Sequence, residues 1–384
     1  MQKEMKIKFP ESGKITIMQV SDPQDLHNVR HVMLKMLNKA YDTVKPDLVI
    51  LTGDNILGNH LDDAIVGPWK NTDTRITAKR MEKALDYVLD PLDERKIPYC
   101  MLYGNHDDMN GFSKQEQAEY YLKHEYFFGL NSDDNGLECD TYNFPIYDST
   151  GEKIALNIWM LDSAGSDSFG NSAYSGVSAE TVAWYKKKSS ELKEQNGGEN
   201  VKSLLFQHIP VKECESLFTP CDENDPDAVK HHGSFYKLDP AKADGYAKEY
   251  SCTCEMETGE FEAVREQGDV MAMVFGHDHQ NSFDAVVDGV RLIQSPGASF
   301  RCEGFKTSRA VRIFEIDEKD PENFKTYILN LYDILGDNPL TDAMYIMSAD
   351  ETEKIRNAVW LGSAAAGLAA VGAGIAKLIK KKRG

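Results

Sequence analysis

Short runs of apolar and β-branched residues recur along the 384-residue chain, and each run stops at a small, acidic or histidine residue. The runs with the residues that follow them are KITIMQV before Ser21-Asp22, DLVILT before Gly53-Asp54, PYCMLY before Gly104-Asn105-His106-Asp107, SLLFQ before His208, and VMAMVF before Gly276-His277-Asp278-His279. Runs this continuous are typical of strands buried on both faces. Because open α/β sheets carry their sites at the carboxyl ends of strands, the pattern predicts that these polar residues meet at one edge.

Stretches with helical periodicity separate the strand-like runs. They cover residues 29–44, 75–92 and 178–195, and the last of them begins at Ser178, a residue suited to an N-cap. Strands that alternate with helices predict an α/β fold.

The chain divides into one large unit and a tail. We expect one domain over residues 1–335. Within it, residues 211–262 are acidic, rich in turn residues and weakly periodic, and we expect a lid over the site there because long irregular loops are uncommon without a function. Residues 336–357 are expected to form a linker.

The tail, residues 358–384, is expected to form an apolar helix with a basic end. Residues 358–376 carry no charge, whereas five of the last eight residues are Lys or Arg. The uncharged length approaches a bilayer span, and the basic end suits anionic head groups. Contact with a membrane surface and packing on a partner or on the chain's own body both remain open.

Charge and cysteine content limit the setting. A net charge of −19 repels nucleic-acid backbones and argues against a nucleic-acid partner. The seven cysteines form no regular framework, and the N-terminal stretch lacks the apolar core of a signal peptide. We therefore expect a cytoplasmic protein, associated with a membrane if the tail binds one.

The residues after the strands have the chemistry of a metal site. Carboxylates, an amide oxygen and imidazoles suit two hard-to-borderline divalent ions, and a carboxylate can bridge the pair. Two ions roughly 3.5–4 Å apart activate water and neutralise an oxyanion, which is the arrangement for phosphoryl transfer. The chemistry therefore points to hydrolysis of a phosphate ester.

The order of these motifs resembles the calcineurin-like metallophosphoesterase superfamily over residues 14–310. The words LTGDNI, YGNHDD, FQHIP and GHDHQNSF are most similar to the purple-acid-phosphatase-related branch, which includes plant proteins labelled inactive purple acid phosphatase. The resemblance implies a four-layer αββα sandwich of two mixed sheets. Leu57 stands where true purple acid phosphatases carry a tyrosine, so a purple ferric site is not expected.

Carried over motif by motif, the resemblance implies that Asp54 bridges two metal ions. It assigns Asp22 and His279 to the first ion, and Asn105, His208 and His277 to the second. His106 would face the substrate and protonate the leaving alkoxide, while a metal-bridging hydroxide attacks phosphorus. Asp107 would either orient His106 or cap the backbone.

Two acidic triplets compete for the first motif, Asp22-Pro23-Gln24 and Asp25-Leu26-His27. Asp22 directly follows its strand, so we assign it as the ligand, with Gln24 in the position that the family gives to histidine. An amide oxygen is a weaker and harder donor than imidazole. We therefore expect manganese or iron, with zinc and magnesium as the alternatives, and a first site that binds weakly.

Candidate substrate contacts are Asn281, which follows the GHDH turn, and Arg301, which can meet a phosphate with two N–H groups. A salt bridge to an acidic residue is an equal alternative for Arg301. The predicted function is a phosphomonoesterase acting on a phosphorylated small molecule or protein. The alternatives are a phosphodiesterase or nucleotide pyrophosphohydrolase, and a metal-binding scaffold with low activity.

Overall fold

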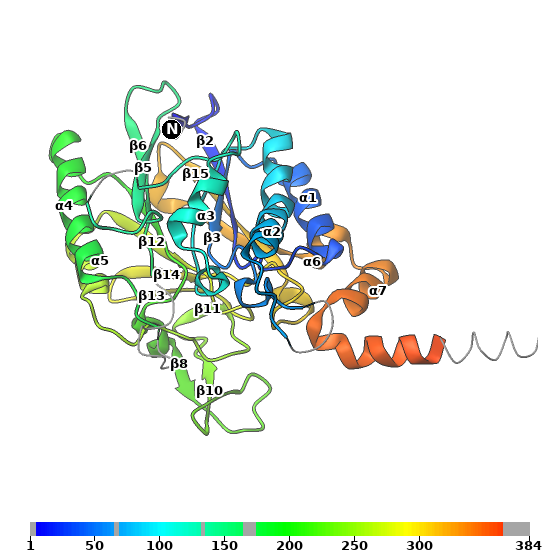
Figure 1. Cartoon of the computed structure of the whole chain (residues 1–384). Coiled ribbons are helices and arrows are strands. Elements are labelled where there is room, and N and C mark those ends of the chain that lie inside the picture. The colour runs from blue at the N-terminus through cyan, green and yellow to red at the C-terminus, as the bar shows by residue number, and fades with distance from the viewer. Residues whose placement is uncertain (1–4, 65–68, 132–134, 164–173, 364–384) are drawn as a thin grey trace, which may run out of the picture.

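Two β-sheets packed face to face form the centre of the protein (Figure 1). The computed structural model describes residues 5–64, 69–131, 135–163 and 174–363. The larger sheet has eight strands, in the spatial order β1 (Ile7–Lys8), β5 (Tyr142–Tyr147), β6 (Ile154–Met160), β7 (Ser203–Phe206), β12 (Val270–Phe275), β14 (Val290–Gln294), β13 (Ser282–Val287) and β11 (Ala243–Tyr246). The smaller sheet has five strands, in the order β16 (Lys325–Asn330), β15 (Ala310–Asp317), β2 (Lys14–Val20), β3 (Leu48–Thr52) and β4 (Tyr99–Leu102). Both sheets are mixed, because parallel and antiparallel neighbours occur in each.

Helices cover the outer face of each sheet. The smaller sheet packs against α1 (His31–Val44), α2 (Thr74–Arg95), α3 (Lys114–Tyr121), α6 (Leu331–Leu335) and α7 (Pro339–Ser348), and the larger sheet against α4 (Ala179–Gln195) and α5 (Glu260–Gln267). The described residues also contain six short 3-10 helices: η1 (Gly58–His60), η2 (Asp107–Asn110), η3 (Lys212–Leu217), η4 (Lys306–Ser308), η5 (Pro321–Asn323) and η6 (Asp350–Thr352). Helix α4 begins where the sequence predicts, with the Ser178 side chain accepting a hydrogen bond from Thr181 N at 3.1 Å.

Burial on both faces explains why the strand runs read as continuous. In β2, Ile17 enters the core between the two sheets, whereas Met18 enters the core under α1 and α2. In β12, Val274 and Met273 divide in the same way between the central core and the core under α4 and α5. Successive side chains of a strand point to opposite faces, so both must be apolar. The four-layer αββα sandwich is confirmed.

Residues 211–262 contain more regular structure than the sequence suggests. Strands β8 (Phe218–Pro220), β10 (Ser234–Leu238) and β9 (Val229–His231) form a small antiparallel sheet at one end of the molecule (Figure 1). Strand β11 joins the larger sheet as its edge strand. The β9–β10 turn uses His232 and Gly233, both with positive φ, the pattern of a tight hairpin. These strands are too short for a periodic signal, and a lid role for the segment stays a prediction.

The expected linker at residues 336–357 is wrong in its middle part, because α7 and η6 pack on the smaller-sheet side. Tyr345 and Ala349 are buried there, and Glu351 pairs with the fully buried Arg309 at 2.7 Å. These anchors tie the segment to the body.

Residues 353–363 are helical and project from the body (Figure 1), with Val359, Trp360 and Leu361 exposed. The rest of the expected C-terminal helix, 364–384, lies outside the described residues. In the part of the chain that the structure covers, no helix is both long and apolar enough to cross a bilayer.

Candidate metal centre

Five strands from both sheets deliver the predicted residues to one edge of the sandwich. Asp22 and Gln24 follow β2, Asp54 follows β3, Asn105 and His106 follow β4, His208 follows β7, and His277 and His279 follow β12. Asp22, Asp54 and His277 have positive φ angles of 49°, 47° and 70°. Left-handed backbone in residues other than glycine is uncommon and concentrates at functional sites.

The donor atoms form two groups that share Asp54. One group contains Asp22, Asp54 and His279, the other contains Asp54, His208 and His277, and within each group the donor atoms lie within 4.8 Å of one another. Asn105 adds its Oδ1 atom 3.2 Å from Nε2 of His208. Overlapping groups with a common carboxylate fit two neighbouring divalent ions.

Two glycines allow the strands to approach this closely. A Cβ atom on Gly53 would lie 2.7 Å from Cγ of His208, and one on Gly104 would lie 2.7 Å from Nε2 of the same ring. The Gly-Asp and Gly-Asn motifs therefore hold glycine because the backbone itself forms the wall of the site.

His208 is held in the tautomer that binds a metal. Its Nδ1 atom donates a hydrogen bond to the carbonyl oxygen of Thr52 at 2.9 Å. In the neutral ring the Nε2 atom therefore carries the lone pair, and this atom lies 3.4 Å from Oδ2 of Asp54. Metal-binding histidines commonly donate their other ring N–H to a carbonyl in this way.

Four buried polar atoms at the site have no hydrogen-bond partner within the described part of the chain. They are Oδ1 of Asp22, Oε1 of Gln24, Oδ2 of Asp54 and Nδ1 of His277. A buried polar atom that makes no bond costs roughly 1–3 kcal/mol, so their convergence at one place needs a compensating partner. Divalent cations satisfy all four atoms, and the residues therefore fit a metal centre.

The electrostatics show mutual stabilisation of opposite charges. Burial opposes ionisation of Asp54, but the neighbouring His208 outweighs it and holds the pKa of Asp54 below its usual value. Burial likewise opposes protonation of His208, and the Asp54 carboxylate outweighs it, raising the pKa of His208 to about 9. For His277, burial and the nearby His208 lower the pKa to about 3, which leaves this ring neutral and free to bind a cation.

Gln24 lies in the site, as the sequence predicts. Its Nε2 atom is 2.9 Å from Nε2 of His279, and its side chain is fully buried. Asp22 contacts the same ring, with Oδ1 3.4 Å from Nε2 of His279. Ligation of a metal by Gln24 stays a prediction.

The competing triplet is excluded from the site. Asp25 accepts hydrogen bonds from the backbone N–H groups of Leu26 and Arg30 and pairs with Arg301. Asp22 and not Asp25 lies in the donor cluster.

His106 and Asp107 have separate environments. The imidazole of His106 is partly exposed, and its Nε2 atom lies 4.0 Å from Oδ2 of Asp54. The buried Asp107 carboxylate instead accepts backbone hydrogen bonds from Asn55 and Ile56 at 3.1 Å and from Gly104 at 2.9 Å. Asp107 therefore caps the backbone and joins two loops, which is the second of the two roles expected for it.

Other residues of the protein engage polar atoms of both predicted substrate contacts, and a substrate role for Asn281 or Arg301 stays a prediction. Asn281 is fully buried, accepts hydrogen bonds from the backbone N–H groups of Lys248 and Glu249, and donates to Asp278. Arg301 bonds Asp25 through Nε at 2.5 Å and the carbonyl of Asn28 through Nη2 at 2.8 Å. The salt-bridge alternative for Arg301 is the one that the structure supports.

Three further residues contact the site without a motif to mark them. Oδ1 of Asn59 lies 3.3 Å from Nδ1 of His106, the Tyr174 ring packs edge-on against His277 at 4.6 Å, and Oε2 of Glu303 lies 3.5 Å from Nδ1 of His279. The hydrogen bond to His279 outweighs burial and lowers the pKa of Glu303 to about 2. Their loop positions carry no periodic signal, so only the folded chain shows their role.

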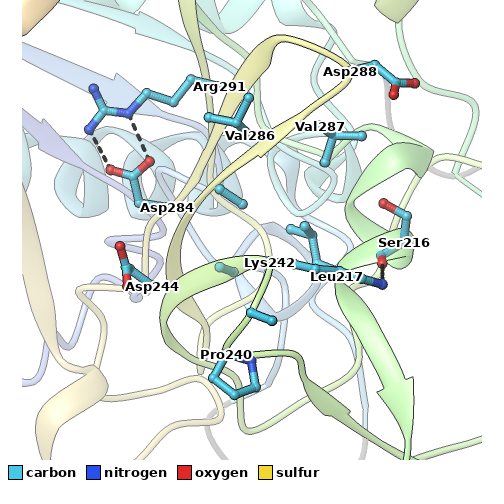
Figure 2. Close-up of a pocket in the computed structure, with 13 residues that line it drawn as sticks. Ser216, Leu217, Pro240, Lys242, Asp244, Asp284, Val286, Val287, Asp288 and Arg291 are labelled. Carbon is cyan, nitrogen blue, oxygen red and sulfur yellow. Dashed lines mark hydrogen bonds and ion pairs between the residues drawn. The ribbon is translucent and has the colours of Figure 1, made fainter.

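Two other features lie apart from this centre. A third potential metal-binding group, Asp86, Asp90 and His124, has its His124 Nδ1 atom bonded to Asp93 at 2.9 Å. A cavity of about 710 Å³ lies between η3, β11 and the β13–β14 hairpin. Figure 2 shows its wall, where Arg291 makes a double hydrogen bond to Asp284. None of the predicted ligands lines this cavity.

Two mixed sheets between helices, with Asp, Asn and His side chains gathered at the strand ends, define the metallophosphoesterase class. The chain belongs to the calcineurin-like phosphoesterase family, whose family model matches residues 15–281.

The chain is also similar to curated plant proteins and to a solved structure. The chain is 23% identical to the probable inactive purple acid phosphatase 29 of Arabidopsis thaliana over 78% of this chain and 75% of that protein. It is 24% identical to the probable inactive purple acid phosphatase 14 of the same plant over 80% of this chain and 77% of that protein. A dimetal phosphatase from Danio rerio matches 83% of this chain and 99% of its own, with a TM-score of 0.47 and 13% identity.

Proposed function

We propose that the protein is a phosphomonoesterase that works with two divalent metal ions. The observation that carries this proposal is the pair of donor groups that share Asp54, with the partly exposed His106 beside them. Donors of both groups lie at the ends of strands from two different sheets, so the folded chain holds them in place without a ligand-dependent rearrangement. Asp22, Gln24, Asp54 and His279 would hold the first ion, and Asn105, Asp54, His208 and His277 the second.

The ions would supply an activated water and positive charge that neutralises the phosphate. The remaining work belongs to the chain's own residues. The His106 imidazole, with a quarter of its side chain exposed, would protonate the leaving oxygen of the ester. A positioned general acid typically contributes 100- to 10,000-fold to the rate. Oxygen donors from Asp22, Gln24 and Asn105 favour manganese or iron(II) over zinc.

A second candidate is a metal-binding protein with little turnover. Gln24 replaces a stronger imidazole donor, and the two Arabidopsis relatives are named as inactive phosphatases. The presence of His106 favours the enzyme, because a scaffold has no need for a proton donor.

The test compares metal content and hydrolysis in one preparation. The protein is loaded with manganese, its metal is quantified, and para-nitrophenyl phosphate is assayed beside bis-para-nitrophenyl phosphate. We expect two metal equivalents and preference for the monoester. Asp54→Asn should lose bound metal and activity together. The exposed His60→Ala serves as a control on the neighbouring turn.

Each other outcome has a defined meaning. Preference for the diester would show that the protein is a phosphodiesterase and would overturn the proposal of a phosphomonoesterase. Full metal content with hydrolysis no faster than that of Asp54→Asn would support the scaffold.

A further inference from the structure

We propose that Asn59 is the positioning residue for His106, a role that rests on the proposed function. Oδ1 of Asn59 lies 3.3 Å from Nδ1 of His106, and Nε2 of the same ring lies 4.0 Å from Oδ2 of Asp54. The two ring nitrogens therefore face different neighbours, one in the η1 turn and the other in the metal centre.

Close packing of two loops delivers Asn59 to this position. A Cβ atom on Gly58 would overlap the carbonyl oxygen of His106, so glycine allows η1 to lie directly on the His106 backbone. Asp107 ties the same loops together through the N–H groups of Asn55 and Ile56. On the other side, Lys70 donates to the carbonyl of Asn59 at 2.7 Å. The backbone that carries Asn59 is thus held by contacts on both of its flanks.

The amide oxygen of Asn59 determines which nitrogen of the His106 ring is protonated. An amide oxygen only accepts, so Nδ1 of His106 must carry the proton that it shares with Asn59. Nε2 is then the nitrogen that faces the reacting ester. In the proposed step the bond between phosphorus and the leaving oxygen breaks, and the Nε2 proton moves to that oxygen. The neutral ring that remains keeps its Nδ1 proton, which is hydrogen-bonded to Asn59, so the ring does not have to change its tautomer.

A carboxylate is a common hydrogen-bond partner for such a histidine, and Asp107 is the carboxylate next to His106 in the sequence. Its carboxylate is occupied by three backbone N–H groups and by the Asn55 side chain. The neutral Asn59 therefore takes over the orienting role without adding negative charge to a site that must bind a phosphate.

Leaving-group dependence tests the role directly. Para-nitrophenolate leaves without protonation, whereas an alkoxide needs a proton. We expect Asn59→Ala to lower kcat/KM for an alkyl phosphate about tenfold, a part of the full general-acid effect, with less than about a twofold loss on para-nitrophenyl phosphate. Asn59→Asp keeps an acceptor oxygen but adds a negative charge, so its activities on the two esters should fall together and their ratio should stay near that of the wild type. His60→Ala alters the same turn without touching His106 and should resemble the wild type on both esters.

A double-mutant cycle separates positioning from independent action. In a His106→Ala background, the further change Asn59→Ala should cost nothing on the alkyl phosphate. Additive losses, or equal losses on the two esters in the single variant, would overturn the proposal.

An activity-independent measurement keeps the two proposals distinguishable. If the metal-loaded wild type hydrolyses neither ester, the proposed function fails, and the tautomer of His106 decides the role of Asn59. Selective ¹⁵N-histidine labelling should show an Nδ1–H tautomer in the wild type and its loss in Asn59→Ala. An unchanged tautomer would sink the positioning role.

Discussion

Replacement of Gly104 by alanine tests whether the backbone forms the wall of the metal centre. The new Cβ atom would lie 2.7 Å from Nε2 of His208, and it would overlap the Asp54 carboxylate as well. Ordinary carbon contacts begin near 3.4 Å, so the His208 ring must move by about 0.7 Å. Gly104 has no positive φ in this structure, but the new Cβ atom would also overlap the backbone N atom of Asp54, so the backbone of the Gly53-Asp54 turn must shift as well.

The expected loss has two parts. Overpacking of a buried site typically costs about 1–3 kcal/mol of unfolding free energy, and this should appear in the metal-free protein as a fall of a few degrees in Tm. Displaced ligands should weaken manganese binding about 10- to 100-fold, the range for changes that disturb ligand orientation. Competition with a fluorescent chelator measures the affinity, and circular dichroism measures Tm.

Gly362 provides the matched control. A Cβ atom there meets nothing within 4 Å, so Gly362→Ala should leave affinity unchanged. Full affinity for two manganese equivalents in Gly104→Ala would refute the claim that this glycine borders the metal centre.

Three other predictions address charge and packing. The pKa of His208 is raised to about 9, and metal binding needs the neutral ring. Manganese affinity should therefore rise about tenfold per pH unit from pH 7 toward pH 9. Calorimetry should record proton release on manganese binding at pH 7, and the absence of this release would contradict the pairing of His208 with Asp54. Arg301→Ala should lower the unfolding free energy by about 1–3 kcal/mol through the orphaned Asp25 and leave KM within about threefold; a KM rise above tenfold would restore a substrate role. Burial raises the pKa of Glu260 to about 8, so the folded state holds one more proton than the unfolded state between about pH 4.5 and 8. The free energy of unfolding should therefore fall as pH rises through that window. Urea titrations should show that Glu260→Gln reduces this dependence of stability on pH.

Most ligand positions could be predicted because each lies directly after a strand that reads clearly in the sequence. Asp54, Asn105, His208 and the two histidines of the GHDH turn are each within four residues of their strand end. A turn this short leaves the side chain little freedom, so the strand fixes where it points. Gln24 was located in the same way, as the second residue beyond Asp22.

Three other polar residues were harder to assign from the sequence, for one reason. Asn281, Arg301 and Asp107 were assigned roles from their neighbours in the chain, but distant loops provide their hydrogen-bond partners. Arg301 meets Asp25 across 276 positions of sequence, and Asp107 meets Asn55 across 52. A polar side chain in a loop can form hydrogen bonds with many different groups of the folded protein. The residues next to it in the sequence do not determine which of these groups becomes its partner.

The sequence by itself determined the sheet architecture and the set of candidate metal ligands, because burial on both faces imposes a mainly apolar pattern on the strands and the candidate ligands follow directly after it. The tertiary structure alone decided how the other polar groups pair, and in particular that Asn59 rather than Asp107 faces the His106 ring. The physical reason is that hydrogen bonds between loops depend on how the two sheets and their turns pack. This packing brings together residues that are far apart in the sequence, and the local sequence around one does not indicate the other.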